Sequence, residues 1–78
     1  RSFRARHGRS VGAHLRAVRV HRAAERLARS DEPIAEIALA VGFSDQSHLN
    51  RWFVRLLGAT PAAYRRQLRG LTLPEVRD

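Results

Sequence analysis

Cysteine is absent from the 78-residue chain, which excludes disulfide bridges, thiol chemistry and cysteine-based zinc sites. No apolar run approaches the roughly 18 residues that suggest a membrane span, and the N-terminal segment lacks the apolar core of a signal peptide. Aromatic residues make up only 6% of the chain, so a core has to come mainly from Leu, Val, Ile and Ala. We therefore expect one small soluble domain, with no membrane partner and a cytoplasmic location.

Lysine is also absent, so all 15 basic residues are arginines. Set against 7 acidic residues, they give the chain a formal net charge of +8. The planar guanidinium group binds two acceptors at once, which suits phosphate and guanine. This charge predicts a polyanionic partner, although an anionic membrane or an acidic protein is also compatible with it.

Patterns typical of catalysis or metal binding do not stand out. There is no Ser-His-Asp arrangement, carboxylate pair or glycine-rich phosphate loop, so we expect neither an enzyme nor a cofactor. His7, His14 and His21 recur at a constant spacing of two helical turns. That spacing separates neighbours by about 10.5 Å along a helix, which is too far for them to share one ion. No metal site is therefore expected.

The stretch from Ile34 to Leu57 predicts two short helices joined by a tight turn. Apolar residues of the first helix recur at the i, i+3, i+4, i+7 spacing of one buried face, namely Ile34, Ile37, Ala38 and Val41. Gly42 follows, where a helix can end on a residue that tolerates a left-handed backbone. Ser44 or Asp45 can then cap a second helix by accepting hydrogen bonds from its free N–H groups.

The second helix, from about Asp45 to Leu57, has an apolar and a polar face. The apolar stripe, with Trp52 at its edge, consists of Leu49, Phe53 and Leu56. The opposite face carries hydrogen-bonding side chains, namely Gln46, Ser47, Asn50 and Arg51. Two helices, a glycine-containing turn and a polar outer face predict a helix-turn-helix DNA reader. We expect Phe43 and Trp52 to belong to the core rather than to stack on bases.

The flanking segments predict two further helices. A long helix runs from Val11 to Arg29 and is broken by the sequence Ser30-Asp31-Glu32-Pro33, with Pro33 placed in the first turn of the next helix. Thr60 caps a last helix that begins at Pro61 and ends at about Arg69.

The two ends of the chain are expected to differ from its middle. Residues 1–7 read as the end of a helix closed by Gly8, and the chain begins without Met, so we expect a piece of a longer protein. Residues 71–78 show no clear period, which predicts a disordered tail.

The segment PIAEIALAVGFSDQSHLNRWFVRLLGATPAAYRR closely resembles the C-terminal half of the AraC/XylS-type regulator DNA-binding domain. That family has an I-A-x-x-V-G-F core, then S-x-S-x-x-x-R-x-F, then G-x-(T/S)-P-x-x-(Y)-R. The core is matched at Ile37, Ala38, Val41, Gly42 and Phe43. The later positions are matched at Gln46 or Asp45, Ser47, Arg51, Phe53, Gly58, Thr60, Pro61, Tyr64 and Arg65. The segment from Leu15 to Leu27 resembles the family's linker helix.

The resemblance implies an all-α fold, a homeodomain-like helix-turn-helix bundle preceded by a long linker helix. It divides the chain into residues 1–9, the remnant of a first recognition helix, residues 10–70, the linker helix, second unit and closing helix, and the tail 71–78. The implied function is a sequence-specific DNA-binding module of a bacterial transcription regulator. A domain absent from this chain would bind any effector ligand.

The resemblance also implies which residues contact double-stranded DNA. The second helix, lying in the major groove, would contact bases through Gln46, Ser47, His48, Asn50 and Arg51. Gln suits adenine and Arg suits guanine, whichever family the chain belongs to. Phosphates would be contacted by Arg1, Arg4, Ser44, Arg55, Arg65 and Arg66. We expect Arg19 and Arg26 of the long helix to pack or to form ion pairs, with Glu25 and Glu36 as candidate partners.

A second function competes with DNA binding. The basic helices could dock an acidic protein such as RNA polymerase, and regulators of this type are expected to contact polymerase as well. In that case the charges of Arg22 and Arg29 should matter more than the amide of Gln46. A cationic membrane-binding helix fits poorly, because the core consumes the apolar faces and Gly and Pro turns interrupt them.

Overall fold

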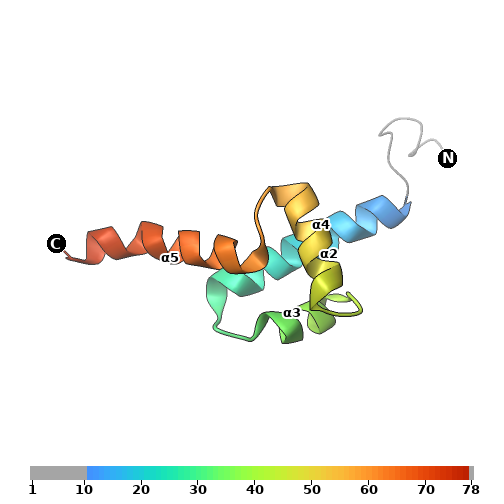
Figure 1. Cartoon of the computed structure of the whole chain (residues 1–78), viewed down its shortest axis with the longest axis horizontal. Helices are drawn as coiled ribbons and strands as arrows, with labels where there is room; N and C mark the ends of the chain where they lie inside the picture. The colour runs from blue at the N-terminus through green and yellow to red at the C-terminus, as the bar shows by residue number, and fades with distance from the viewer. Residues whose placement is uncertain (1–10, 78) are drawn as a thin grey trace.

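The computed structural model describes the backbone of residues 11–77 and the side chains of residues 11–70. The regular secondary structure in this part of the chain is all α-helix. Its helices are α2 (Val11–Arg29), α3 (Ile34–Val41), α4 (Gln46–Leu57) and α5 (Pro61–Arg77). The predicted all-α fold is confirmed, and α3, the turn and α4 form the helix-turn-helix, packed on the long helix α2 (Figure 1). The expected remnant helix at residues 1–7 lies outside the described residues. No described helix has both the length and the apolar character that crossing a membrane requires.

The core lies where α2, α3 and α4 meet. Its buried side chains come from all three helices and the turn, namely Val20, Ala23, Ala24, Leu27, Ile37, Ala38, Phe43, Leu49 and Phe53. Phe43 is buried as predicted, whereas Trp52 is half-buried and packs against the edge of this core. Helix α5 joins through Tyr64, whose ring meets that of Phe53 edge to face at 5.4 Å between centroids.

The turn between α3 and α4 depends on Gly42, which has a left-handed backbone with a φ of 108°. The Gly42 amide donates to Leu39 O and the Phe43 amide to Ala38 O, at 3.2 and 2.9 Å. This pair of bonds satisfies carbonyls that the helix end would otherwise leave free. A Cβ at Gly42 would also lie 2.8 Å from Nε of Arg19, which packs across the turn from α2. The backbone angle therefore requires glycine, and a Cβ would in addition displace the end of the Arg19 side chain.

The caps of α4 and α5 follow local sequence signals, whereas the position of Pro33 differs from the prediction. Asp45, rather than Ser44, caps α4 by accepting a 2.8 Å hydrogen bond from the His48 amide. Thr60 Oγ1 accepts from the Ala63 amide at 3.1 Å and caps α5 as predicted. Pro33 does not lie in the first turn of α3 but just before it, at the N-cap, where it has no side-chain oxygen to offer.

The end of the last helix was predicted wrongly. The structure continues α5 through Gly70 to Arg77, whereas the sequence predicted an end at about Arg69. The predicted disorder of residues 71–78 stays a prediction. Gly70 does not end the helix, because the described glycines with positive φ are Gly42 and Gly58. A glycine in right-handed conformation costs only about 1 kcal/mol in a helix interior, so its presence does not enforce a stop. Residue 78 lies outside the described residues.

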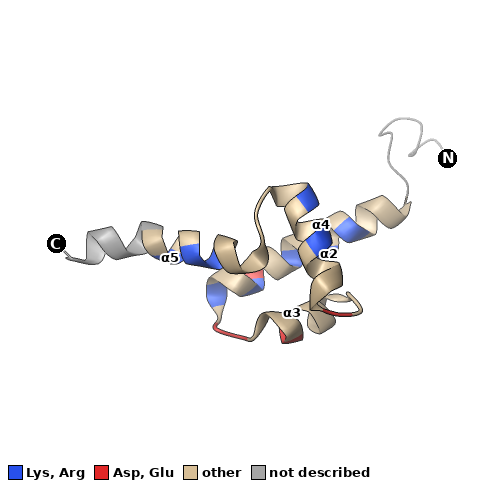
Figure 2. Cartoon of the chain, in the orientation of Figure 1, with Lys and Arg blue, Asp and Glu red and all other residues tan. Residues whose placement is uncertain are grey.

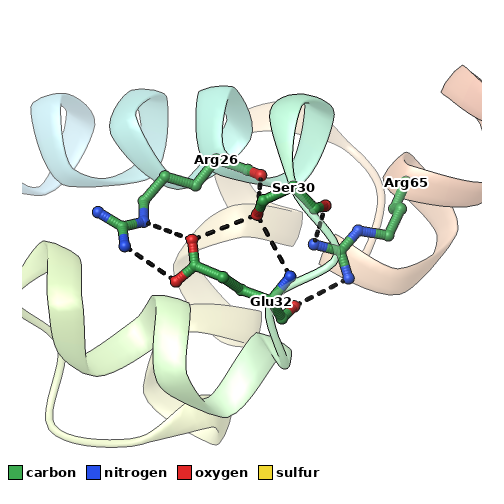
Figure 3. A network of polar contacts seen from close by, with 4 residues as sticks. All are labelled: Arg26, Ser30, Glu32 and Arg65. Atoms are coloured by element: carbon green, nitrogen blue, oxygen red, sulfur yellow. Dashed lines mark hydrogen bonds and ion pairs between the residues drawn. The ribbon is translucent and has the colours of Figure 1, made fainter.

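Arg65 of α5 holds the connection between α2 and α3 (Figure 3). Its guanidinium group donates to the carbonyls of Leu27, Ser30 and Glu32, at 3.2, 2.9 and 3.0 Å. These carbonyls belong to the last turn of α2 and to the segment after it, where a helix leaves its acceptors unpaired. One side chain therefore fixes the end of α2, the loop and the start of α5 relative to one another.

Two ion pairs reinforce the same loop. Arg26 pairs with Glu32 through two contacts of 2.9 and 3.2 Å, so its partner is neither Glu25 nor Glu36, the two that we expected. Hydrogen bonding and charge from Arg26 hold the pKa of the Glu32 carboxyl below its usual value. Arg69 binds Asp31 and lowers the pKa of that carboxyl in the same way. The loop is thus clamped to α2 on one side and to α5 on the other.

Alanine substitutions at three glycines should rank by backbone angle and space. Gly42→Ala should destabilise most, since left-handed backbone alone costs an L-residue roughly 1–2 kcal/mol and Arg19 must also move. Gly58→Ala, with a φ of 80° but open space around it, should cost only the backbone part. Gly70→Ala should be neutral or stabilising by up to about 1 kcal/mol. Chemical denaturation measures all three, and equal effects at Gly42 and Gly58 would contradict the role given to Arg19.

Loss of the Arg65 contacts should be costly. Arg65→Ala leaves part-buried carbonyls without their donor, which costs about 1–3 kcal/mol of unfolding free energy. Arg65→Lys should not restore it, because an ammonium group cannot reproduce the planar fork. Arg66→Ala, an exposed neighbour with the same charge, is the control and should stay within about 0.5 kcal/mol of the parent. Equal stability of the Arg65 and Arg66 variants would refute this role.

The ion pairs at the loop predict how stability depends on pH. The folded-state pKa values of Glu32 and Asp31 lie below the unfolded ones, so this stabilisation is complete above the usual carboxyl range. It is lost as the pH falls through the folded-state values. Glu32→Gln should therefore be less stable than the parent near neutral pH, with the difference shrinking in acid. A pH series of unfolding curves measures this difference, and a difference that does not shrink in acid would contradict the role of the Arg26–Glu32 ion pair.

Candidate nucleic-acid interface

The outer face of α4 exposes a continuous set of polar side chains. Leu49 and Phe53 are fully buried and fix which side of the helix faces the core. Three predicted base-contacting residues are exposed, Ser47 and Arg51 on the other side and Gln46 in the first turn of the helix. They lie in the first half of the helix, the part that contacts base edges in helix-turn-helix proteins. The structure thus brings these three together on one accessible surface.

His48, a fourth predicted base contact, is half-buried and already engaged. Its ring meets Phe43 edge to face at 5.1 Å between centroids. Nδ1 lies 3.1 Å from Ser44 Oγ and 3.4 Å from the Ser44 amide nitrogen. Because a backbone N–H only donates, Nδ1 acts as the acceptor, and a neutral ring then carries its hydrogen on Nε2. Only Nε2–H is left to contact a ligand.

Asn50, the fifth predicted base contact, lies at the margin of this surface. The residue is half-buried, and its Oδ1 is buried without a hydrogen-bond partner. Its amide oxygen therefore faces the protein rather than the exposed side of α4. Val54, which the sequence analysis did not single out, is 43% exposed on the helix. Its apolar side chain matches the thymine methyl group, the one apolar feature of the major groove.

The residues predicted to contact phosphate have different surroundings. Arg55 and Arg66 are exposed, as is Ser44, which sits just before α4 beside His48. Arg65 donates from all three of its side-chain nitrogens to backbone carbonyls, so its guanidinium group is already engaged within the protein. Arg1 and Arg4 lie outside the described residues. The phosphate-contact prediction stays open for all of these residues.

Figure 2 shows most of the described acidic residues in the α2–α3 loop and on α3, and arginines on α2, α4 and α5. Acidic side chains gather at the α2–α3 loop and on α3, at Asp31, Glu32 and Glu36, and two of these three are paired with arginines. The outer side of α4 carries Arg51 and Arg55, and its one nearby acid, Asp45, serves as the N-cap. The polar face of α4 is therefore basic.

Two arginines contact the indole ring of Trp52, which no sequence signal indicated. Arg16 of α2 and Arg55 of α4 place their guanidinium carbons 4.1 and 5.2 Å from the centroid of that ring. In the sequence, Arg16 is one of several arginines along α2. Its contact depends on how α2 and α4 cross, and periodicity within a single helix cannot show this.

A concave feature of the described surface lies away from α4. A hollow of about 380 Å³ between α2 and α3 is lined by Arg22, Glu25, Arg26, Ala40 and Val41. Its walls combine both signs of charge with small apolar side chains, so they favour no particular ligand. Within the described residues, no three His, Cys, Asp or Glu side chains gather as metal ligands would.

The sequence matches known proteins over most of its length. A family described as a helix-turn-helix domain matches residues 1–67. The MmsAB operon regulatory protein of Pseudomonas aeruginosa is 31% identical over 67 residues, which cover 86% of this chain and 22% of that protein. The right origin-binding protein of Escherichia coli is 38% identical over 66 residues, 85% of this chain and 23% of that protein.

A third relative is the RCS-specific HTH-type transcriptional activator RclR of Escherichia coli, 36% identical over 69 residues. The match covers 88% of this chain and 24% of RclR, so the chain spans less than a quarter of each of these relatives. No solved structure matches it significantly. The family match, the turn at Gly42 and the polar face of α4 agree, and the chain belongs to the AraC/XylS-type helix-turn-helix family.

Proposed function

We propose that this chain is the sequence-specific DNA-binding module of a bacterial transcription regulator, with α4 in the major groove. Membership of a family of helix-turn-helix transcription regulators already supports a DNA-binding regulatory module. The observation that carries the finer proposal is the exposure of Gln46, Ser47 and Arg51 in the first half of α4, with Ser47 and Arg51 opposite the buried Leu49 and Phe53. A helix held by its apolar side presents the polar side to a ligand.

The exposed side chains have the chemistry that base edges require. Arg51 can bridge O6 and N7 of guanine, and Gln46 can donate to and accept from adenine. Ser47 can do either with a single hydroxyl group. His48 would contribute through Nε2–H, and Asn50 would contribute at the edge of the contact. Specificity in this proposal rests mainly on Gln46 and Arg51.

Phosphate contacts would hold the helix in register without reading sequence. Arg55, Arg66 and Ser44 are the described candidates, and Arg1 and Arg4 remain proposed contacts outside the described residues. In the whole regulator, an effector ligand would be bound elsewhere, contact with RNA polymerase would accompany DNA binding, and the protein would act in the cytoplasm.

Selection from a pool of random duplex DNA tests this function. We expect the parent to enrich a short motif, and Arg51→Ala to lose about 1–3 kcal/mol of binding free energy and to relax one position of that motif. Gln46→Ala should relax a different position. Arg29→Ala, which removes an exposed charge at the far end of α2, should keep the motif. If none of the four proteins enriches a motif and their DNA affinities fall equally steeply with salt, base reading by α4 is contradicted.

The competing function, docking of an acidic protein, is supported by exposed arginines away from α4. Arg22 and Arg29 are exposed on α2, and neither forms an ion pair with a described carboxylate. Binding of RNA polymerase in the absence of DNA, lost in Arg22→Ala or Arg29→Ala and retained in Gln46→Ala, would favour this alternative.

A further inference from the structure

The cluster of Arg16, Trp52 and Arg55 joins α2 to one flank of α4. Both guanidinium groups lie over the same indole ring, with their carbons 4.1 and 5.2 Å from its centroid. Such stacking fixes an arginine side chain that would otherwise sample many rotamers. Less conformational entropy is then lost when the group binds a ligand. We call these three residues the arginine cradle.

The donors of the cradle lack acceptors within the described protein. Arg26 and Arg69 have carboxylate partners, but neither Arg16 nor Arg55 lies within ion-pair distance of a described carboxylate. Neither guanidinium group donates a hydrogen bond to another described residue, and the Nε atom of Arg16 is buried without a partner. Arg16 is therefore held by packing and stacking alone. Its terminal nitrogens are fixed in place without an acceptor of their own.

The cradle is continuous with the polar face of α4. Arg55 follows Arg51 by one helical turn, so the two are neighbours on the helix surface. Trp52 and Arg16 extend that surface to the side on which α2 crosses. An α-helix with its side chains is about 10–12 Å wide and nearly fills a major groove of about 12 Å. Groups on the flank of such a helix therefore face the sugar-phosphate backbone.

We propose that Arg16 and Arg55, both held against Trp52, form a binding site for one backbone phosphate of DNA. This assigns a DNA contact to α2, which the base-reading helix alone does not provide. The phosphate oxygens supply the anionic acceptors that both guanidinium groups lack, and contact with Trp52 holds both groups at the same flank of α4. The proposal rests on the proposed function, since it presumes that α4 lies in the major groove.

Salt dependence of DNA binding tests the cradle by charge. Each phosphate contact contributes about 0.9 to the slope of log K against log salt. Arg16→Gln should lower the slope by about that amount and leave the selected motif unchanged, because a phosphate contact carries no sequence information. Arg22→Gln removes the same charge from an exposed site on the same helix and should retain the parental slope. Equal slopes for the parent and Arg16→Gln would overturn the proposal.

Neutral methylphosphonate links, placed one at a time along the bound duplex, test the cradle by position. One neutral link beside α4 should lower the DNA affinity of the parent. The same link should not lower the affinity of Arg16→Gln or Arg55→Gln, whereas it should lower that of Arg22→Gln as much as that of the parent. If Arg16→Gln and Arg55→Gln become insensitive to neutral links at two different positions, the two arginines do not share one phosphate and the proposal is refuted. Thermal unfolding checks that each variant is folded, and Arg55, which is exposed, provides the test if Arg16→Gln is not.

The single tryptophan of the chain gives a direct readout, because it is part of the cradle. Trp52 emission should change when DNA binds to the parent and to Arg22→Gln, and the change should be reduced in Arg16→Gln. An unchanged response in Arg16→Gln would count against the cradle. If the parent selects no motif, the proposed function fails, but the slopes on a generic duplex still test the phosphate site.

Discussion

The backbone at Gly42 is the constraint on which the described structure depends. Helices of 8 and 12 residues, such as α3 and α4, are too short to be stable alone in water. The left-handed turn lets both lay their apolar sides on α2, and it directs Phe43 into the core immediately after the bend. Arg19 closes over the glycine from α2. The angle at which α4 presents its outer face is therefore set by a residue that has no side chain.

Local patterns predicted what local physics determines. The bounds of α2, the helical ends at Gly42 and Gly58 and the cap at Thr60 follow from neighbouring residues, and each was predicted correctly. The end of α5 was not, because a glycine permits a stop without requiring one. The exposed face of α4 was also predictable, since its apolar stripe alone decides which side chains turn outward.

The roles of individual arginines could not be predicted in this way. Arg65 and Arg66 are adjacent in the sequence, yet Arg65 donates hydrogen bonds to three backbone carbonyls whereas Arg66 is exposed. A long flexible side chain reaches whatever acceptor the tertiary structure places near it, and that acceptor can be far away in the sequence. The contact of Arg16 with Trp52 has the same origin. The count of 15 arginines thus overstates the number of guanidinium groups that are free to contact DNA, because carboxylates and carbonyls already engage some of them.

The cap at Asp45 has a consequence for how α4 meets its ligand. The carboxylate of Asp45 at the start of the helix accepts a hydrogen bond from the His48 amide, and Arg55 lies in the last turn. Both placements match the helix macrodipole, so they stabilise the helix as well as polarise it. The positive end of the helix dipole is thus compensated by Asp45, whereas the other end of α4 carries the cationic Arg55. A polyanion attracts the Arg55 end more strongly than the Asp45 end, so the orientation of the protein is biased during the diffusional encounter, before any base is touched.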